Sequence, residues 1–169
     1  VGHWTRLYCR AFYVEPRDRA EDPVVIVPCE LPQVSTRLVR EAVVRIRSAA
    51  TAAGLPAGDV DALARRVIAP RLMVTATHTH AGPGHFFENK RLGGATSSHY
   101  PGFDPGLVDY LADRIAQAVV LAYRDRAHAE LRWVGTHLWG IAQNGELDAL
   151  RLNVPGVELP DPTVELAPE

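Results

Sequence analysis

The chain has 169 residues, of which 47% are hydrophobic, and its formal net charge is -2, which is an ordinary composition for one globular domain. This near-neutral charge gives no electrostatic basis for binding nucleic acid or an anionic membrane surface. No apolar run reaches the roughly 18 residues that a membrane-spanning helix needs. Met73 is the only methionine, so we expect the sequence to be a piece of a longer protein.

The first half of the chain predicts two strands followed by two helices. Residues 6–14 are rich in β-forming side chains, and the continuous apolar run 23–29 is typical of a strand buried on both faces. Apolar residues then recur every three or four positions, which predicts a helix that Ser35 caps and Gly54 ends. A second, shorter helix is expected to begin with Asp59 as its cap.

The second half continues this alternation of strands and helices. An apolar strand is expected over 71–77, a long glycine-containing loop over 81–105, a helix capped by Asp104, and a strand over 130–138. This order predicts an α/β layered domain with a mixed, largely parallel sheet flanked by helices. No element is apparent in the last twenty residues, so residues 1–169 would then form an incomplete part of a larger domain.

The two cysteines fall in the first two predicted strands. A disulfide between Cys9 and Cys29 is one interpretation, because the two strands are close in sequence. Free cysteines are commonly small buried residues, and we favour that interpretation here. No CxxC spacing is present, so a cysteine metal site is not expected.

The most informative segment is Val74–Gly84, VTATHTHAGPG, in which His78 and His80 follow a predicted strand. Side chains two apart on a strand project to the same side, so the imidazoles are expected about 6.5–7 Å apart at their bases. Neutral imidazoles at this edge of an α/β sheet suit a Zn²⁺ ion or a substrate beside it. On spacing alone, two ordinary hydrogen-bonded histidines remain the alternative.

The other candidate residues have weaker signals. His85 and His99 are interpreted as exposed loop histidines, and His137 as a hydrogen-bonded residue of a strand. Trp133 is expected in the core. The first helix carries four arginines that we interpret as a solvated face, namely Arg37, Arg40, Arg45 and Arg47.

The octet Thr77–Gly84, THTHAGPG, resembles the THTH(S/A)GPG signature of neutral, non-lysosomal ceramidases and their bacterial relatives. The paired strands upstream, the helix after Ser35 and the helix over 107–123 are also similar to that family. Residues 161–164, DPTV, are similar to a DPxV segment of distant members. The resemblance covers most of the chain, but only the octet is highly specific.

The resemblance implies a zinc-dependent amidohydrolase that cleaves the N-acyl bond of ceramide or a related lipid into a fatty acid and a sphingoid base. In this family the position of His78 is a zinc ligand, and that of His80 orients or polarises the substrate amide or the attacking water. The family's further ligands, a His, a Glu and a Tyr, are expected outside this chain, so the fragment alone is expected to be inactive. The resemblance also implies a secreted or cell-surface location, and it leaves the oligomeric state open.

The sequence departs from the family pattern at three places, which keeps two alternatives open. His85 stands where glycine is commoner, residues 143–145 (QNG) replace an Asn-Arg pair, and the usual N-terminal Gly-x-x-x-Asp-Ile-Thr-Pro start is missing. One alternative is a non-catalytic fragment or pseudoenzyme of the same fold. The other is a different HxH metallohydrolase that completes its site with His85, His99 or His137.

Overall fold

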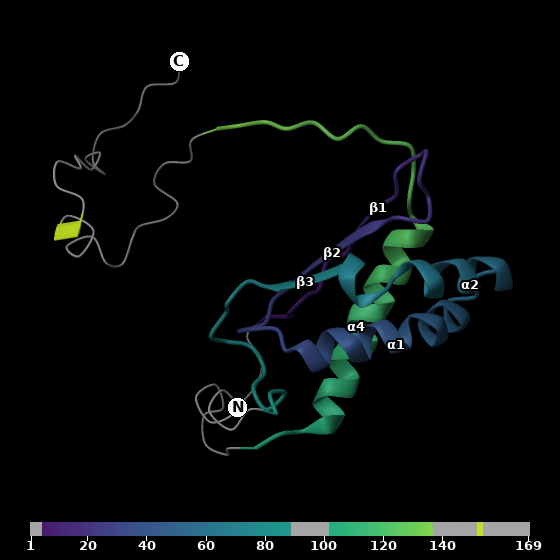
Figure 1. The fold of residues 1–169 in the computed structure, drawn as a ribbon. Coiled ribbons are helices and arrows are strands. Elements are labelled where there is room, and N and C mark those ends of the chain that lie inside the picture. The colour runs from purple at the N-terminus through teal and green to yellow at the C-terminus, as the bar shows by residue number, and fades with distance from the viewer. Residues whose placement is uncertain (1–4, 89–101, 137–151, 154–169) are drawn as a thin grey trace. The chain divides into compact units, whose positions relative to one another are not determined.

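The computed structural model describes residues 5–88, 102–136 and 152–153. The chain divides into two compact units, residues 1–128 and 129–169, and each is described by itself. In the first unit the structure describes three strands, three α-helices and one 3₁₀ turn (Figure 1). In chain order these are β1 (Phe12–Val14), β2 (Val24–Cys29), α1 (Thr36–Ala52), α2 (Ala57–Arg66), η1 (Ala69–Arg71), β3 (Leu72–Ala76) and α4 (Pro105–Arg124).

The three strands form one mixed sheet in the order β1-β2-β3. β1 pairs antiparallel with β2, because the short connection between them allows the chain only to turn back. β2 pairs parallel with β3, since α1 and α2 lie between them in the sequence and carry the chain back over the sheet. The predicted α/β fold with a mixed sheet is therefore confirmed. The expectation of a largely parallel sheet is confirmed only in part, because one of the two strand pairings is parallel.

The helices lie on one side of this sheet (Figure 1). On β2, Val25 and Val27 are fully buried toward the helices. Val24, whose side chain points to the other face of the strand, is 49% exposed. Met73 on β3 is likewise 57% exposed. In the described residues β2 is thus covered on one face, and the prediction of burial on both faces is wrong. The apolar run is explained by the preference of strands for β-branched side chains, and this preference does not require helices on both faces of the sheet.

The helix ends follow the local signals that the sequence carries, with one exception. The side chains of Ser35 and Asp104 each accept a hydrogen bond from the backbone N–H three residues on, at 3.1 Å, and Gly54 takes a positive φ of 74° after α1. Asp59 is not a cap, because α2 begins two residues earlier, directly after a proline. Its carboxylate instead accepts a hydrogen bond from the hydroxyl of Tyr123 at 2.9 Å, which ties α2 to α4.

The core of the unit lies between α1, α4 and the buried face of the sheet. α1 contributes one stripe at helical spacing, and α4 contributes a longer one. None of the helices in the described residues is long and apolar enough to cross a membrane. The fully buried aliphatic side chains include Leu38, Ile46, Leu63, Val108, Ile115 and Val119.

The basic side of α1 is joined to its neighbours by ion pairs. Arg45, whose side chain is 20% exposed, pairs with Asp109 and Asp113 of α4, and Arg47 pairs with Asp61 of α2. The interpretation of a fully solvated face is therefore wrong for Arg45, which fixes α1 against α4. An arginine with a long apolar stem can lie along a helix interface and still present its charge to carboxylates.

Cys9 and Cys29 form a disulfide, so the prediction of free cysteines is wrong. Ahead of β1 the chain continues along β2, and an antiparallel bridge places Cys9 directly opposite Cys29. Opposite residues in an antiparallel pair lie close enough for their side chains to bond. The sequence shows that both residues are in neighbouring strands, but it does not show the register that brings them face to face.

In the second unit the structure assigns no strand to the described residues 129–136, so the predicted strand over 130–138 is wrong for that part. A strand exists only where a second backbone completes its hydrogen bonds, and no described neighbour does so here. Trp133 is exposed, which contradicts the core position expected for it. His137 lies outside the described residues.

A first testable consequence concerns Tyr13, whose hydroxyl is buried beside α4. Its ring meets that of Tyr123 edge to face, with 5.3 Å between the ring centroids. Burial, and then the nearby carboxylate of Glu15, raise the pKa of Tyr13 from 10.0 to about 12. The folded state therefore favours the neutral phenol, so this stabilisation is complete below pH 10 and is lost as the pH rises from 10 to about 12.

Urea unfolding at pH 8 and pH 11 measures this effect. We expect the ionisation of Tyr13 to lower the free energy of unfolding by about 1 kcal/mol between the two pH values, a figure discounted because Tyr13 is only half-buried. Tyr13→Phe should remove that part of the loss. Tyr110→Phe, on the exposed side of α4, is the matched control and should decline like the wild type. Equal declines in the wild type and Tyr13→Phe would contradict the assignment.

Candidate functional site

The two histidines of the octet lie just beyond the carboxyl end of β3. The strand ends at Ala76, and the next residue, Thr77, donates its N–H to the carbonyl of Cys29 at 3.0 Å. His78 then takes a positive φ of 61°, which turns the chain out of the strand direction. The expectation that the pair shares one face of a strand is therefore wrong. The structure nevertheless brings the rings of His78 and His80 together, with centroids 5.0 Å apart and planes at 67°.

His78 is oriented by a backbone carbonyl from the neighbouring strand's end. Its Nδ1 lies 2.9 Å from the carbonyl oxygen of Pro32, three residues beyond β2. A carbonyl oxygen only accepts hydrogen bonds, so Nδ1 carries the hydrogen, and in the neutral imidazole Nε2 keeps its lone pair. Metal-binding histidines commonly have one nitrogen held in this way, which fixes both tautomer and ring orientation. The side chain of His78 therefore has the form that a metal ligand needs.

The site sits at the carboxyl edge of the parallel pair β2 and β3, where Cys29 and Ala76 are register partners. Beyond these two residues one strand leads to Pro32 and the other to His78, so the parallel pairing itself brings the carbonyl and the imidazole together. This edge is the usual place for ligands in α/β sheets. The expected location of the pair at such an edge agrees with the structure.

Gly82 allows the loop to pass close to the Pro32 segment. A Cβ atom at this position would lie 3.2 Å from Cδ of Pro32 and 3.3 Å from Cγ2 of Thr79. Both distances are tighter than ordinary packing, so a larger residue would force the neighbours to move. The hydroxyl of Thr79 also accepts the N–H of Ala81 at 3.2 Å, which closes the turn locally.

Two phenylalanines anchor the far end of the loop 77–88. Phe86 is fully buried and Phe87 is 5% exposed, and their ring centroids are 4.5 Å apart. Glu88, which follows them, forms an ion pair with Arg37 in the first turn of α1, and the Arg37 guanidinium lies 5.0 Å from the ring centroid of Phe103. The loop is thus fastened at both ends to the segment 32–37. Sequence reasoning missed this anchor, although two adjacent phenylalanines in a glycine-rich loop are a usable signal for it.

His85 and the remaining histidines do not join the pair in the described part of the chain. His85 is partly buried, with a positive φ of 63°, and its carbonyl accepts the N–H of Asp104 at 2.7 Å, so it is less exposed than expected. His99 and His137 lie outside the described residues. Among the residues that are described, no group of three or more His, Cys, Asp or Glu side chains is placed to hold a metal ion.

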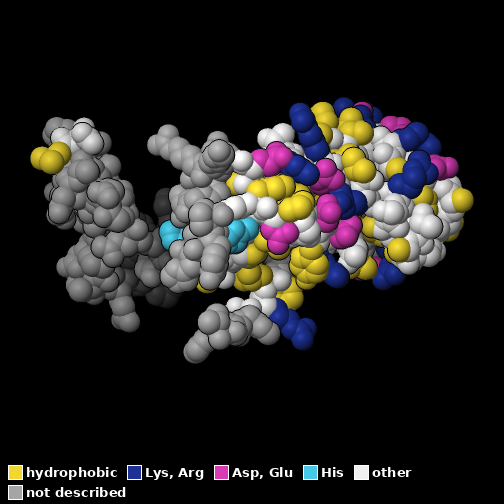
Figure 2. Space-filling model, turned by 90° about the horizontal axis from the view of Figure 1, so that it is seen from below, with side chains coloured by type: hydrophobic (Ala, Val, Ile, Leu, Met, Phe, Trp, Pro, Cys, Tyr) yellow, Lys and Arg dark blue, Asp and Glu magenta, His cyan; other side chains and the backbone are white. Residues whose placement is uncertain are grey.

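The histidine pair lies on an open surface. His78 and His80 are both exposed, and Figure 2 shows histidine side chains at the surface close to hydrophobic and acidic ones. Two depressions of about 410 and 550 Å³ are found elsewhere: the first at the carboxyl ends of α1 and α4, the second between β1 and α4. Neither is lined by His78 or His80, so we place the candidate site on the chemistry of the pair and not on cavity size.

Comparison with known proteins identifies a family for most of the chain. The family model described as neutral/alkaline non-lysosomal ceramidase, N-terminal, matches residues 1–155. No curated protein and no solved structure matches the chain significantly.

Proposed function

The chain belongs to the neutral/alkaline non-lysosomal ceramidase family, and on this premise we propose that His78 and His80 contribute to a zinc-dependent amidohydrolase site. The substrate would be ceramide or a related N-acyl lipid, cleaved to a fatty acid and a sphingoid base. The observation that carries the proposal is the hydrogen bond from Nδ1 of His78 to the Pro32 carbonyl. In the neutral imidazole this bond leaves the lone pair of Nε2 free to bind a metal ion at the carboxyl edge of the sheet.

In this proposal His78 would hold the zinc ion through Nε2. When bound, zinc supplies a Lewis acid that polarises a carbonyl and lowers the pKa of a water molecule. The Pro32 carbonyl holds the His78 ring before any ligand arrives, so little orientational freedom remains to be lost on binding. The other ligands would come from outside the described residues, since these contain no further cluster.

His80 would act on the substrate side of the site. Its ring lies next to that of His78 but at an angle of 67° to it, and its side chain is exposed. An imidazole in this position can donate a hydrogen bond to the amide oxygen, or accept a proton from the water that attacks it. We therefore assign His78 to metal binding and His80 to catalysis.

The test is metal analysis and amide hydrolysis with the protein at its natural length. We expect one zinc per chain, loss of ceramide hydrolysis when a chelator removes the metal, and recovery when zinc is added back. An ester analogue of the same lipid separates amidase from esterase chemistry. A protein without zinc and without turnover would favour the pseudoenzyme alternative and contradict the proposal.

A further inference from the structure

The turn that presents the Pro32 carbonyl is fastened to the N-terminal arm, which we define as residues 7–11. The Cys9–Cys29 disulfide links the arm covalently to the last residue of β2. Two backbone hydrogen bonds flank it, from Arg10 N–H to the Pro28 carbonyl at 3.0 Å and from Glu30 N–H to the Tyr8 carbonyl at 2.9 Å. The arm therefore pairs with this end of β2 on the side away from β3.

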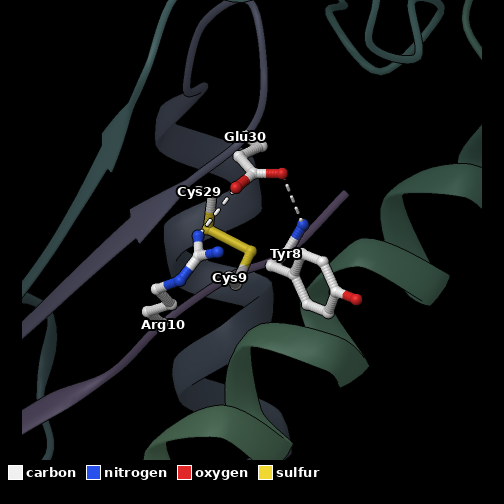
Figure 3. The surroundings of a disulfide bond; sticks show 5 residues. All are labelled: Tyr8, Cys9, Arg10, Cys29 and Glu30. Atoms are coloured by element: carbon white, nitrogen blue, oxygen red, sulfur yellow. Dashed lines mark hydrogen bonds and ion pairs between the residues drawn. A yellow bond between two sulfur atoms is a disulfide. The ribbon is translucent and has the colours of Figure 1, made fainter. Parts of the chain in front are cut away.

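The Glu30 side chain adds a second connection to the same arm (Figure 3). One carboxylate oxygen accepts the backbone N–H of Tyr8 at 3.1 Å, and the other accepts the guanidinium of Arg10 at 2.7 Å. The hydrogen bond from Arg10 holds the pKa of Glu30 below its usual value, so the carboxylate stays charged at neutral pH. Charge-assisted hydrogen bonds of this kind are stronger than neutral ones.

Cys29 also touches the segment that carries the histidines. Its carbonyl accepts the N–H of Thr77 at 3.0 Å and that of Leu31 at 2.8 Å, and Leu31 is 3% exposed. The arm and the residue before His78 therefore meet at one residue, Cys29, the arm through its disulfide and Thr77 through its carbonyl. Because Pro32 is three residues beyond Cys29, a shift of Cys29 moves the acceptor of His78 as well.

We propose that the Cys9–Cys29 disulfide and Glu30 are positioning elements for His78, which hold the Pro32 carbonyl where it fixes the Nδ1–H tautomer. The His78 imidazole bonds to the Pro32 carbonyl and not to Cys9, Cys29 or Glu30, so their effect passes through the backbone of residues 29–32. The contacts of Cys29 and Glu30 support the effect on the orientation of His78. The consequence for zinc binding rests on the proposed function.

The tautomer of His78 can be read directly in the metal-free protein. Two-bond ¹H–¹⁵N correlation spectra of ¹⁵N-histidine-labelled protein distinguish a hydrogen on Nδ1 from one on Nε2, and His78→Gln identifies the signal. We expect the wild type to show a dominant Nδ1–H pattern. In Cys9→Ala/Cys29→Ala combined with Glu30→Gln, the two nitrogen shifts should move toward each other, as they do when both tautomers are populated.

A destabilised control separates positioning from general loss of stability. Leu63→Ala removes a fully buried side chain of α2, away from the histidine pair, and should lower stability while the Nδ1–H pattern of His78 stays unchanged. If the combined variant does not fold, Glu30→Gln alone and the reduced wild type give the same reading with smaller shifts. An unchanged His78 pattern in all of these variants, or an equal change in Leu63→Ala, would overturn the proposal.

Zinc titration then measures the consequence. We expect the combined variant to bind zinc about 10-fold more weakly than the wild type, as is typical when a partner behind a ligand is lost. A wild type that binds no zinc would contradict the proposed function. The tautomer spectra would still show whether the disulfide and Glu30 position His78. Normal zinc affinity together with an averaged tautomer would contradict the expected dependence of zinc binding on the positioning of His78.

Discussion

We expect His78→Ala to abolish zinc binding, and His80→Ala to retain most of the zinc while kcat falls by about 10²–10⁴-fold. The difference follows from the two environments. His78 has one nitrogen fixed on the Pro32 carbonyl and the other free as a donor, whereas His80 is an exposed neighbour with its ring 5.0 Å away. A zinc site with one of its few protein ligands removed loses most of its affinity, and a catalytic site without its acid or base keeps its metal.

The measurement is zinc content by mass spectrometry beside amide hydrolysis, on the same preparations. His128→Ala is the matched control, because this exposed histidine follows α4 and takes no part in the pair. It should leave both quantities unchanged. Zinc lost from His80→Ala and kept in His78→Ala would reverse the assigned roles. Zinc lost from His85→Ala would instead favour an HxH site completed within this chain.

The fold could be predicted from the sequence where a local signal decides the structure. Ser35 and Asp104 cap their helices as expected, because a side-chain oxygen and the N–H three residues on interact within one turn. The prediction failed at Asp59, where the proline ahead of α2 set an earlier start. It also failed for residues 130–136, since a strand depends on a partner that no local pattern can supply.

The site was predictable in its residues but not in its geometry. The octet names His78 and His80, yet the left-handed backbone of His78 and the adjacency of the two rings follow from tertiary contacts. The Pro32 carbonyl leaves no trace in the sequence, because every residue has a backbone acceptor. The disulfide is similar: both cysteines are visible, but only the register of Cys9 against Cys29 shows that they bond.

Phe86→Ala should have the largest effect on stability, a loss of about 3–5 kcal/mol in the free energy of unfolding. Phe86 is fully buried, and its ring packs against that of Phe87 at a tilt. It fixes the end of the loop that begins at the histidine pair. Truncation removes its packing and leaves a cavity that the surrounding side chains fill only in part. Because the far end of the loop is then held only by Phe87 and the Glu88–Arg37 ion pair, we also expect zinc affinity to fall. Urea unfolding and zinc titration measure the two effects.

Phe12→Ala gives the same chemical change at a site of different burial. Phe12 lies on β1 and is 57% exposed, on the side of the sheet away from the helices. Its truncation should cost about 1 kcal/mol or less and leave zinc affinity unchanged. Equal losses for the two variants would contradict the anchoring role of Phe86. A larger loss at Phe12 would indicate that the outer face of β1 and β2 is covered in the intact protein, so that this face, and not the loop, carries the greater part of the packing energy.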